Sequence, residues 1–166
     1  MNPTEQAMRG VVEETFAALA FMFPLDAEGA AAVDPGTMER AVVEFSGPFR
    51  GALLISASAE MLEPLAANML GLEDGVCPSR EQRRDAFKEL LNVICGNLLP
   101  VIASPRQVFD VNEPRLLAGE DDYRSAVRLG ELGTIDMDLD TGHIRLTLLA
   151  EHQPTAAETA PGGKQA

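Results

Sequence analysis

The stretch that decides the fold is SREQRRDAFKELLNVICGNLLPVIA, residues 79–103. Ser79 follows a proline and stands three residues before Gln82, which is the S-x-x-Q form of a capping box at a helix N-terminus. Apolar residues then recur at helical offsets to about Ile102. The sequence therefore predicts one long helix over residues 79–102, and this helix has the clearest start of any element in the chain.

A helical wheel of this segment separates an apolar stripe from a polar ridge. At about 100° per residue, the apolar stripe lies within about 60° of Phe87, and its other members are Leu91, Ile94, Leu98, Val101 and Ile102. The polar ridge lies on the opposite side, between about 140° and 200°, and consists of Asp85, Glu89, Asn92 and Gly96. The stripe is predicted to be buried, and the ridge to face outward.

Gly96 is the most informative member of the polar ridge. A glycine inside a helix costs about 0.5 to 1 kcal/mol relative to alanine, so another role should justify it. Pro100, four residues later, has no N–H and leaves the Gly96 carbonyl without its usual donor. A bare position beside a free carbonyl favours a docking surface, where another backbone approaches closely.

The spacing alone leaves other interpretations of the polar ridge open. Solvated helix faces routinely carry Asp, Glu and Asn, so a plain surface has the same pattern. Asp85 and Glu89, four residues apart, resemble a weak cation site, but two carboxylates supply too few oxygen ligands for one. His143 and His152 are isolated in the sequence and are interpreted as surface residues rather than catalytic bases.

The rest of the chain predicts helices and antiparallel strands. Before the long helix we expect a helix over residues 4–23, a loop over 26–36 and a hairpin over 38–56. A further helix runs to Leu70 and ends at Gly71, and it starts either with Ser58 as its cap or, because of Pro64, near Glu63. After it, QVFDV predicts a strand and LLAGEDD a loop, while YRSAVRLGEL, TIDMDLD and HIRLTLLAE predict strands, the last two joined by a turn at residues 140–142. The predicted class is α+β, with long helices packed on an antiparallel β-sheet.

Size and charge narrow the classes of function. The 166 residues predict a single domain over 1–152 and a flexible tail over 153–166, which lacks bulky apolar residues. The net charge of −13 disfavours nucleic acid and anionic membranes as partners and favours a protein, although solubility alone also accounts for acidity. Two cysteines without a disulfide or metal spacing, and the lack of a targeting or membrane-spanning segment, predict a cytoplasmic protein.

The polar ridge belongs to a longer motif. Asp85, Glu89 and Asn92 form D-x-x-x-E-x-x-N, a G-N-x-x-P pattern follows from Gly96 to Pro100, and a further proline stands at 114. This motif resembles the CheC, CheX and FliY phosphatases of bacterial chemotaxis, most closely the CheX branch. The resemblance implies an α+β fold and removal of phosphate from the aspartyl phosphate of a CheY-like response-regulator receiver.

The resemblance also implies a role for each site residue. Asn92 would orient the attacking water and Glu89 would contact the active-site lysine of the receiver, so these two are the candidate catalytic residues. Asp85, Gly96 and Asn97 are the candidate docking residues. The chain itself would hold no metal or other cofactor, because the receiver would hold Mg²⁺. One site is expected, and a homodimer is suggested only by analogy with CheX.

Two other functions remain open on the same residues. The first is a non-catalytic CheX-like module that binds or sequesters a receiver or another signalling protein, for which an acidic surface and a flattened helix suffice. The second is a structural component of the flagellar switch, which would not need Asn92. The amide at position 92 therefore argues against this structural role, and both receiver-directed functions stay open.

Overall fold

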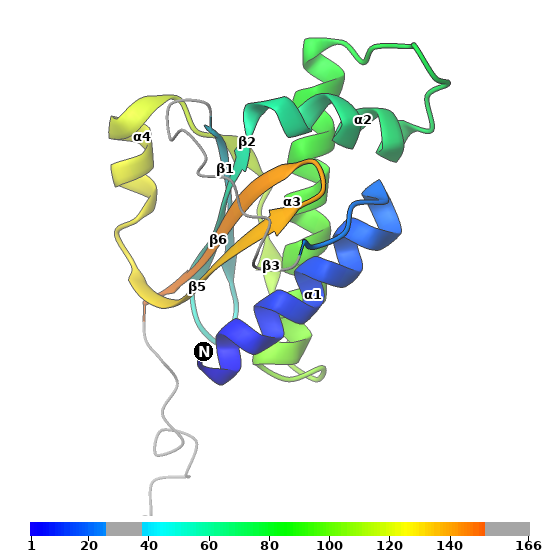
Figure 1. Ribbon diagram of the computed structural model, residues 1–166. Helices are drawn as coiled ribbons and strands as arrows, with labels where there is room; N and C mark the ends of the chain where they lie inside the picture. Colours follow the sequence, from blue (N-terminus) through cyan, green and yellow to red (C-terminus); the bar gives the residue numbers. More distant parts are fainter. Residues whose placement is uncertain (26–37, 152–166) are drawn as a thin grey trace, which may run out of the picture.

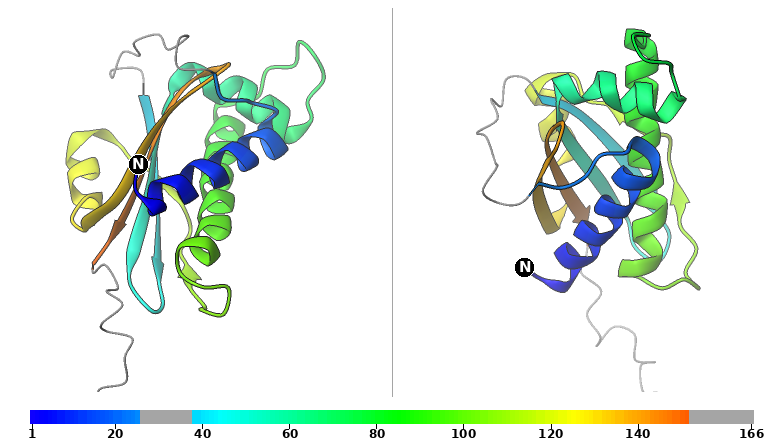
Figure 2. Two further views of the ribbon diagram at one scale, coloured as in Figure 1. Left: turned by 60° about the horizontal axis from the view of Figure 1, so that its bottom comes forward. Right: turned by 45° about the vertical axis from the view of Figure 1, so that its right-hand side comes forward.

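The computed structural model describes residues 1–25 and 38–151. Within these ranges, helices cover both faces of a six-stranded antiparallel sheet (Figures 1 and 2). One face carries α1 (Pro3–Ala20), α2 (Leu62–Leu70), which follows the 3-10 turn η3 (Ala59–Met61), and α3 (Arg80–Ile102). The short helix α4 (Gly119–Ala126) lies on the other face. The predicted α+β class, with long helices on an antiparallel sheet, is confirmed.

The sheet is built around two long hairpins. Its strands are β1 (Met38–Ser46), β2 (Gly51–Ser58), β3 (Asp110–Val111), β4 (Arg115–Leu116), β5 (Gly130–Leu139) and β6 (Gly142–Ala150). The order is β3-β1-β2-β6-β5, and β4 also pairs with β1. Both predicted hairpins are present, because β1 pairs with β2 and β5 pairs with β6. The central strand β2 is buried along almost its whole length, since helices cover both of its faces.

Helix α3 packs its apolar stripe against the rest of the core. Phe87, Leu91, Ile94 and Leu98 are at most 1% exposed, as the wheel predicts. Val101 was also placed in this stripe, but it is 60% exposed. A wheel gives the direction of a side chain and not whether a neighbour covers it, and the last turn of α3 leaves Val101 uncovered.

The capping box at the start of α3 is present as predicted. The Ser79 hydroxyl accepts a hydrogen bond from the Gln82 N–H at 3.1 Å, and the Gln82 side chain accepts one from the Ser79 N–H at 2.9 Å. These two bonds satisfy backbone donors that the first turn of a helix leaves free. The start of the helix is therefore determined by residues that are neighbours in the sequence.

Helix α1 ends earlier than the predicted range of 4–23. It covers Pro3–Ala20, and Phe21 adopts a left-handed conformation with φ of 53°, so the chain leaves the helix before Pro24. Its N-terminus has a second capping box, in which the Asn2 side chain accepts from the Glu5 N–H at 2.8 Å and the Glu5 carboxylate accepts from the Asn2 N–H at 3.0 Å. This box was not among the predicted features.

Ser58 does not cap the second helix, and of the two predicted starts the one near Glu63 is confirmed. The Ser58 hydroxyl accepts a hydrogen bond from the His143 N–H at 3.0 Å, which ties the end of β2 to β6. Helix α2 begins four residues later, at Leu62, so Pro64 lies in the first turn, where a missing N–H costs little. Gly71 ends this helix with a positive φ of 64°, as expected.

The segment between α3 and β5 differs most from the predictions. Within QVFDV only Asp110–Val111 is a strand, LLAGEDD contains the start of α4 rather than a loop, and the residues YRSA of the predicted strand YRSAVRLGEL are helical. Helix α4 has no Ser, Thr, Asn or Asp at its N-cap. The Asp122 carboxylate instead accepts a hydrogen bond from the Ala118 N–H at 2.9 Å, a contact that local pattern rules do not include.

The predicted loop over 26–36 and the predicted tail over 153–166 lie outside the described residues, as does His152. The domain boundary at 152 therefore remains a prediction. None of the helices in the described ranges is long and apolar enough to cross a membrane.

Candidate functional site

All five candidate site residues lie on α3, and the four that form the polar ridge point away from the core. Asp85, Glu89, Gly96 and Asn97 are exposed, and Asn92 is half-buried. The buried stripe of the same helix sets this orientation, because side chains about half a turn apart point in opposite directions. The ridge is thus presented by a helix that cannot rotate without exposing its core residues.

Three of these residues meet in a hollow between α3 and the β3–β4 segment. The hollow has a volume of about 490 Å³. Its lining from α3 consists of Asp85, Lys88, Glu89 and Asn92, and its lining from the opposite wall consists of Val111, Asn112, Glu113 and Pro114. Gly96 and Asn97 are not part of this lining and lie further along the helix. The structure therefore brings the two candidate catalytic residues and Asp85 to one concave surface.

The opposite wall of this hollow is tied to the edge of the sheet. Val111 pairs with Phe45 of β1, and the Asn112 N–H donates to the Glu44 carbonyl at 2.9 Å. Just before β3, the Phe109 ring packs edge-on against two other phenylalanine rings, with centroids 5.2 and 5.7 Å apart. These contacts fix the wall to the edge of the sheet.

The charged groups of the hollow differ in what they contact. Lys88 Nζ lies 3.5 Å from Asp85 Oδ1, which partly neutralises that carboxylate. Glu89 and Asn92 make no side-chain hydrogen bond or ion pair with any other residue in the described ranges. A carboxylate and an amide without partners, side by side at a hollow, are free to bind groups of another molecule.

Gly96 has no packing role among the residues that the structure describes. A Cβ atom built on it would meet no other group within 4 Å, so an alanine would fit without any movement. The helix therefore carries a glycine that its own fold does not require. This observation agrees with the interpretation of Gly96 as part of a docking surface.

Neither cysteine has the properties of a nucleophile. Burial raises the pKa of the Cys95 thiol to about 12. The pKa of the Cys77 thiol is also raised, first by its hydrogen bond to Glu63 and then by the charge of that carboxylate. The thiolate is the reactive form of cysteine, and both environments disfavour it.

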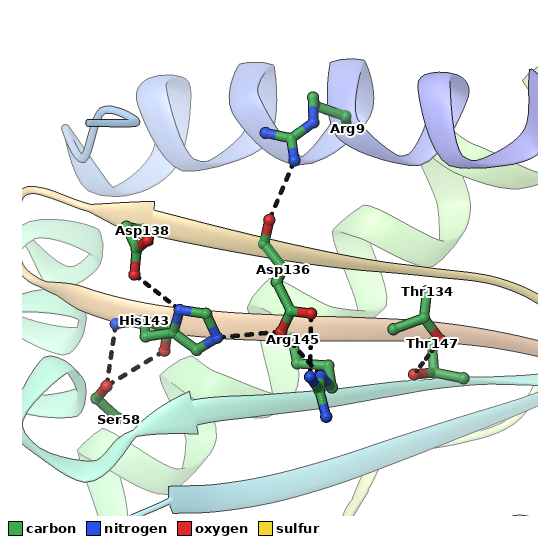
Figure 3. A network of polar contacts seen from close by, with 8 residues as sticks. All are labelled: Arg9, Ser58, Thr134, Asp136, Asp138, His143, Arg145 and Thr147. Carbon is green, nitrogen blue, oxygen red and sulfur yellow. Dashed lines mark hydrogen bonds and ion pairs between the residues drawn. The ribbon is translucent and has the colours of Figure 1, made fainter. Parts of the chain in front are cut away.

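His143 is not isolated, contrary to the sequence-based interpretation. Its Nδ1 lies 2.8 Å from Asp138 Oδ1 and its Nε2 lies 3.1 Å from Asp136 Oδ1, as Figure 3 shows. Arg145 Nε also donates to Asp136 at 2.8 Å. Partial burial raises the pKa of Asp136, but the hydrogen bonds from Arg145 and His143 outweigh it and hold that pKa below its usual value.

The sequence contained a signal for this network. A short turn at residues 140 and 141 sets the register of the hairpin, which pairs Asp138 with His143 and Asp136 with Arg145. In contrast, Lys88, Asn112 and Glu113 were missed as lining residues of the hollow. Only the tertiary pairing of β3 with β1 brings the latter two beside α3.

Together these features define an α+β protein whose candidate site lies on the outer face of a long helix, beside a hollow. The model of the family described as chemotaxis phosphatase CheX matches residues 40–132, which is more than half of the chain. The chain belongs to this family. No match was found among proteins of curated function.

Solved structures show the same fold. The chemotaxis protein CheX of Desulfovibrio desulfuricans is 16% identical, with a TM-score of 0.65 over 90% of this chain and 100% of that one. CheX in a complex with CheY, BeF₃ and Mg²⁺ from Borrelia burgdorferi is 15% identical, with a TM-score of 0.62 over 89% and 97%. FliY of Thermotoga maritima is 12% identical, with a TM-score of 0.55 over 90% and 91%. At these identities the likeness concerns the fold.

Proposed function

We propose that this protein is a phosphatase that hydrolyses the aspartyl phosphate of a CheY-like receiver. The observation that carries the proposal is the position of Glu89 and Asn92, which stand without partners among the described residues at the hollow beside α3. Membership of the CheX family supports the reaction class. The Borrelia burgdorferi complex supports the partner class, because that CheX is in a complex with CheY and BeF₃, which resembles a phosphoryl group when a carboxylate oxygen binds its beryllium.

Asn92 is proposed to orient the attacking water. In the reaction, a water oxygen forms a bond to phosphorus while the bond from phosphorus to the aspartyl oxygen breaks, giving a free carboxylate and inorganic phosphate. An acyl phosphate is already activated, so holding water in line with the leaving carboxylate is the main task. A neutral amide performs it without repelling the phosphoryl oxygens.

Glu89 is proposed to contact a lysine of the receiver. A carboxylate close to a phosphoryl group is repelled unless it is directed at a cation, so the role of Glu89 is to pair with the lysine and fix the orientation of the two proteins. Asp85, Gly96 and Asn97 would extend the contact surface along α3. Mg²⁺ would come with the receiver, and the reaction needs no covalent intermediate on this chain.

The test compares the wild-type protein with Asn92→Ala on a phosphorylated cognate receiver. Loss of one oriented polar group costs about 2 to 4 kcal/mol of barrier, so the rate constant for phosphate loss should fall by roughly 30- to 900-fold. Binding of the receiver should change far less, because Asn92 acts on the water. Equal rates with wild type, with Asn92→Ala and with receiver alone would contradict the proposal.

The alternative is a CheX-like module that binds a receiver without chemistry. The exposed ridge, with its bare glycine, is equally suited to such docking. Stoichiometry separates the two functions, since an enzyme turns over many receivers and a sequestering module acts once. If one-tenth of an equivalent of this protein clears the phosphate from the receiver, the module without chemistry is excluded.

A further inference from the structure

The α3 helix carries three cations in a row that leads to the candidate site. Arg80, Arg84 and Lys88 are each separated by four residues, and the next positions at this spacing are Asn92 and Gly96. Residues four apart on an α-helix form one continuous ridge and are about 6 Å apart along its axis. We call Arg80, Arg84 and Lys88 the cation row.

The cation row borders a second hollow that is continuous with the first. This second hollow has a volume of about 720 Å³ and runs between the first half of α3 and residues 113–116. The two hollows share four lining residues, which are Asp85, Lys88, Glu113 and Pro114. A single groove therefore extends from Asn92 and Glu89 at one end to Arg84 and Arg80 at the other.

The fold does not account for the two arginines of the row. Within the described ranges, Arg80 and Arg84 form no ion pair, although the chain carries 26 acidic residues. Arg80 is the first residue of α3, where the positive end of the helix dipole disfavours a cation, and Arg84 stands four residues later, where like charges repel. Both side chains are exposed. Their placement costs stability, which binding of a partner would explain.

The other charges in the groove restrict what could bind there. Lys88 is paired with Asp85, Arg115 is held by Asp122 at 2.9 Å, and Glu81 and Glu113 also line the groove. A large polyanion such as nucleic acid would be repelled by these carboxylates and by the net charge of −13. A narrow line of carboxylates on a protein surface would fit this groove. It would contact the cation row on α3 and stay clear of Glu113 on the opposite wall.

We propose that the cation row binds an acidic segment of the receiver, next to the site where its phosphoaspartate is hydrolysed. This inference rests on the function proposed above. With the phosphoryl group at Asn92, the carboxylates of that segment would lie about 6 to 18 Å away, which is one to three steps of about 6 Å along the helix. The cation row then sets the affinity for the receiver, and Glu89 and Asn92 set the rate of the reaction.

The test reverses two charges of the row and two charges elsewhere. The variant is Arg80→Glu/Arg84→Glu, and the control is Arg124→Glu/Arg128→Glu. The control changes the net charge by the same amount. Its two arginines are exposed and lie on the opposite face of the sheet, Arg124 within α4 and Arg128 two residues after its end. An acidic side chain at position 80 is favoured by the helix N-terminus, whereas two glutamates four residues apart repel as the two arginines do. The first variant should therefore unfold at about the temperature of the wild type, and its circular dichroism spectrum shows whether it is folded.

Binding is measured in an Asn92→Ala background, so that it does not depend on catalysis. Titration calorimetry with the BeF₃ adduct of the cognate receiver should give an affinity about tenfold weaker for Arg80→Glu/Arg84→Glu at low ionic strength, and nearly unchanged for the control. With Asn92 present, KM should rise for the same variant while kcat stays constant.

The outcomes separate this inference from the proposed function. Equal weakening by both pairs of substitutions, no weakening by either, or a fall in kcat at constant KM would overturn the role of the cation row. If the wild-type protein does not accelerate phosphate loss at all, the proposed phosphatase function fails. The calorimetric comparison would still decide whether the cation row binds the receiver.

Discussion

Replacing Gly96 with alanine should raise stability and lower activity at once. The added methyl group meets nothing within 4 Å, so it carries no steric penalty. Alanine is favoured over glycine inside a helix by about 0.5 to 1 kcal/mol. For a domain of this size, where about 1 kcal/mol shifts Tm by roughly 2 to 4 °C, the melting temperature should rise by about 1 to 4 °C.

Gly10 provides a matched control for this prediction. It lies in α1, is exposed, and also has open space around a built Cβ atom. Gly10→Ala should therefore give a similar gain in stability. If α3 docks the receiver, only Gly96→Ala should raise KM in the phosphatase assay, because the methyl group would stand between two closely packed surfaces. A leucine at position 96 should raise KM further.

Stability is measured by urea denaturation followed by circular dichroism, with an unchanged m-value as the sign that only stability has changed. Two results would refute the reasoning. If Gly10→Ala stabilises the protein and Gly96→Ala does not, the fold itself constrains Gly96. If both stabilise it and even Gly96→Leu leaves KM unchanged, this part of α3 is not a contact surface.

Two further predictions concern the fold. Phe87 is fully buried, so Phe87→Ala should lower the free energy of unfolding by about 3 to 5 kcal/mol in a urea titration, and a loss below about 1 kcal/mol would contradict its place in the core. Partial burial raises the pKa of Asp136, but hydrogen bonds from Arg145 and His143 lower it by more than burial raises it. The resulting pKa lies below the ordinary value of 3.8. The contribution of Asp136 to stability is therefore present above about pH 3.8 and lost as pH falls below that value, so Asp136→Asn should flatten the stability curve there.

The elements that the sequence predicted well are those determined by neighbouring residues. The start of α3 depends on Ser79 and Gln82, which bond to one another. The β5–β6 hairpin depends on alternating side chains and a short turn. In both cases every group that decides the structure lies within a few residues, so local rules contain the necessary information.

The elements that the sequence did not predict depend on distant contacts. Strands β3 and β4 have two residues each, too few for any periodicity, and they exist because β1 offers a free edge to pair with. Helix α4 is surrounded by residues that suggest a loop, yet it buries Ala126 against the outer face of the sheet. The same limit applies to the site. The wheel identified the polar ridge, whereas the groove requires β3 and β4.

This arrangement assigns stability and binding to opposite sides of one helix. Phe87 and Leu91 are buried and hold α3 in place. Their sequence neighbours Glu89 and Asn92 face outward and have no side-chain partner in the described part of the chain. Variants of the buried side should lower stability and activity together, since the ridge moves with the helix. Variants of the exposed side should alter binding or rate while the free energy of unfolding stays constant or rises. A ridge residue whose replacement strongly destabilises the fold would therefore show that the two sides are not independent.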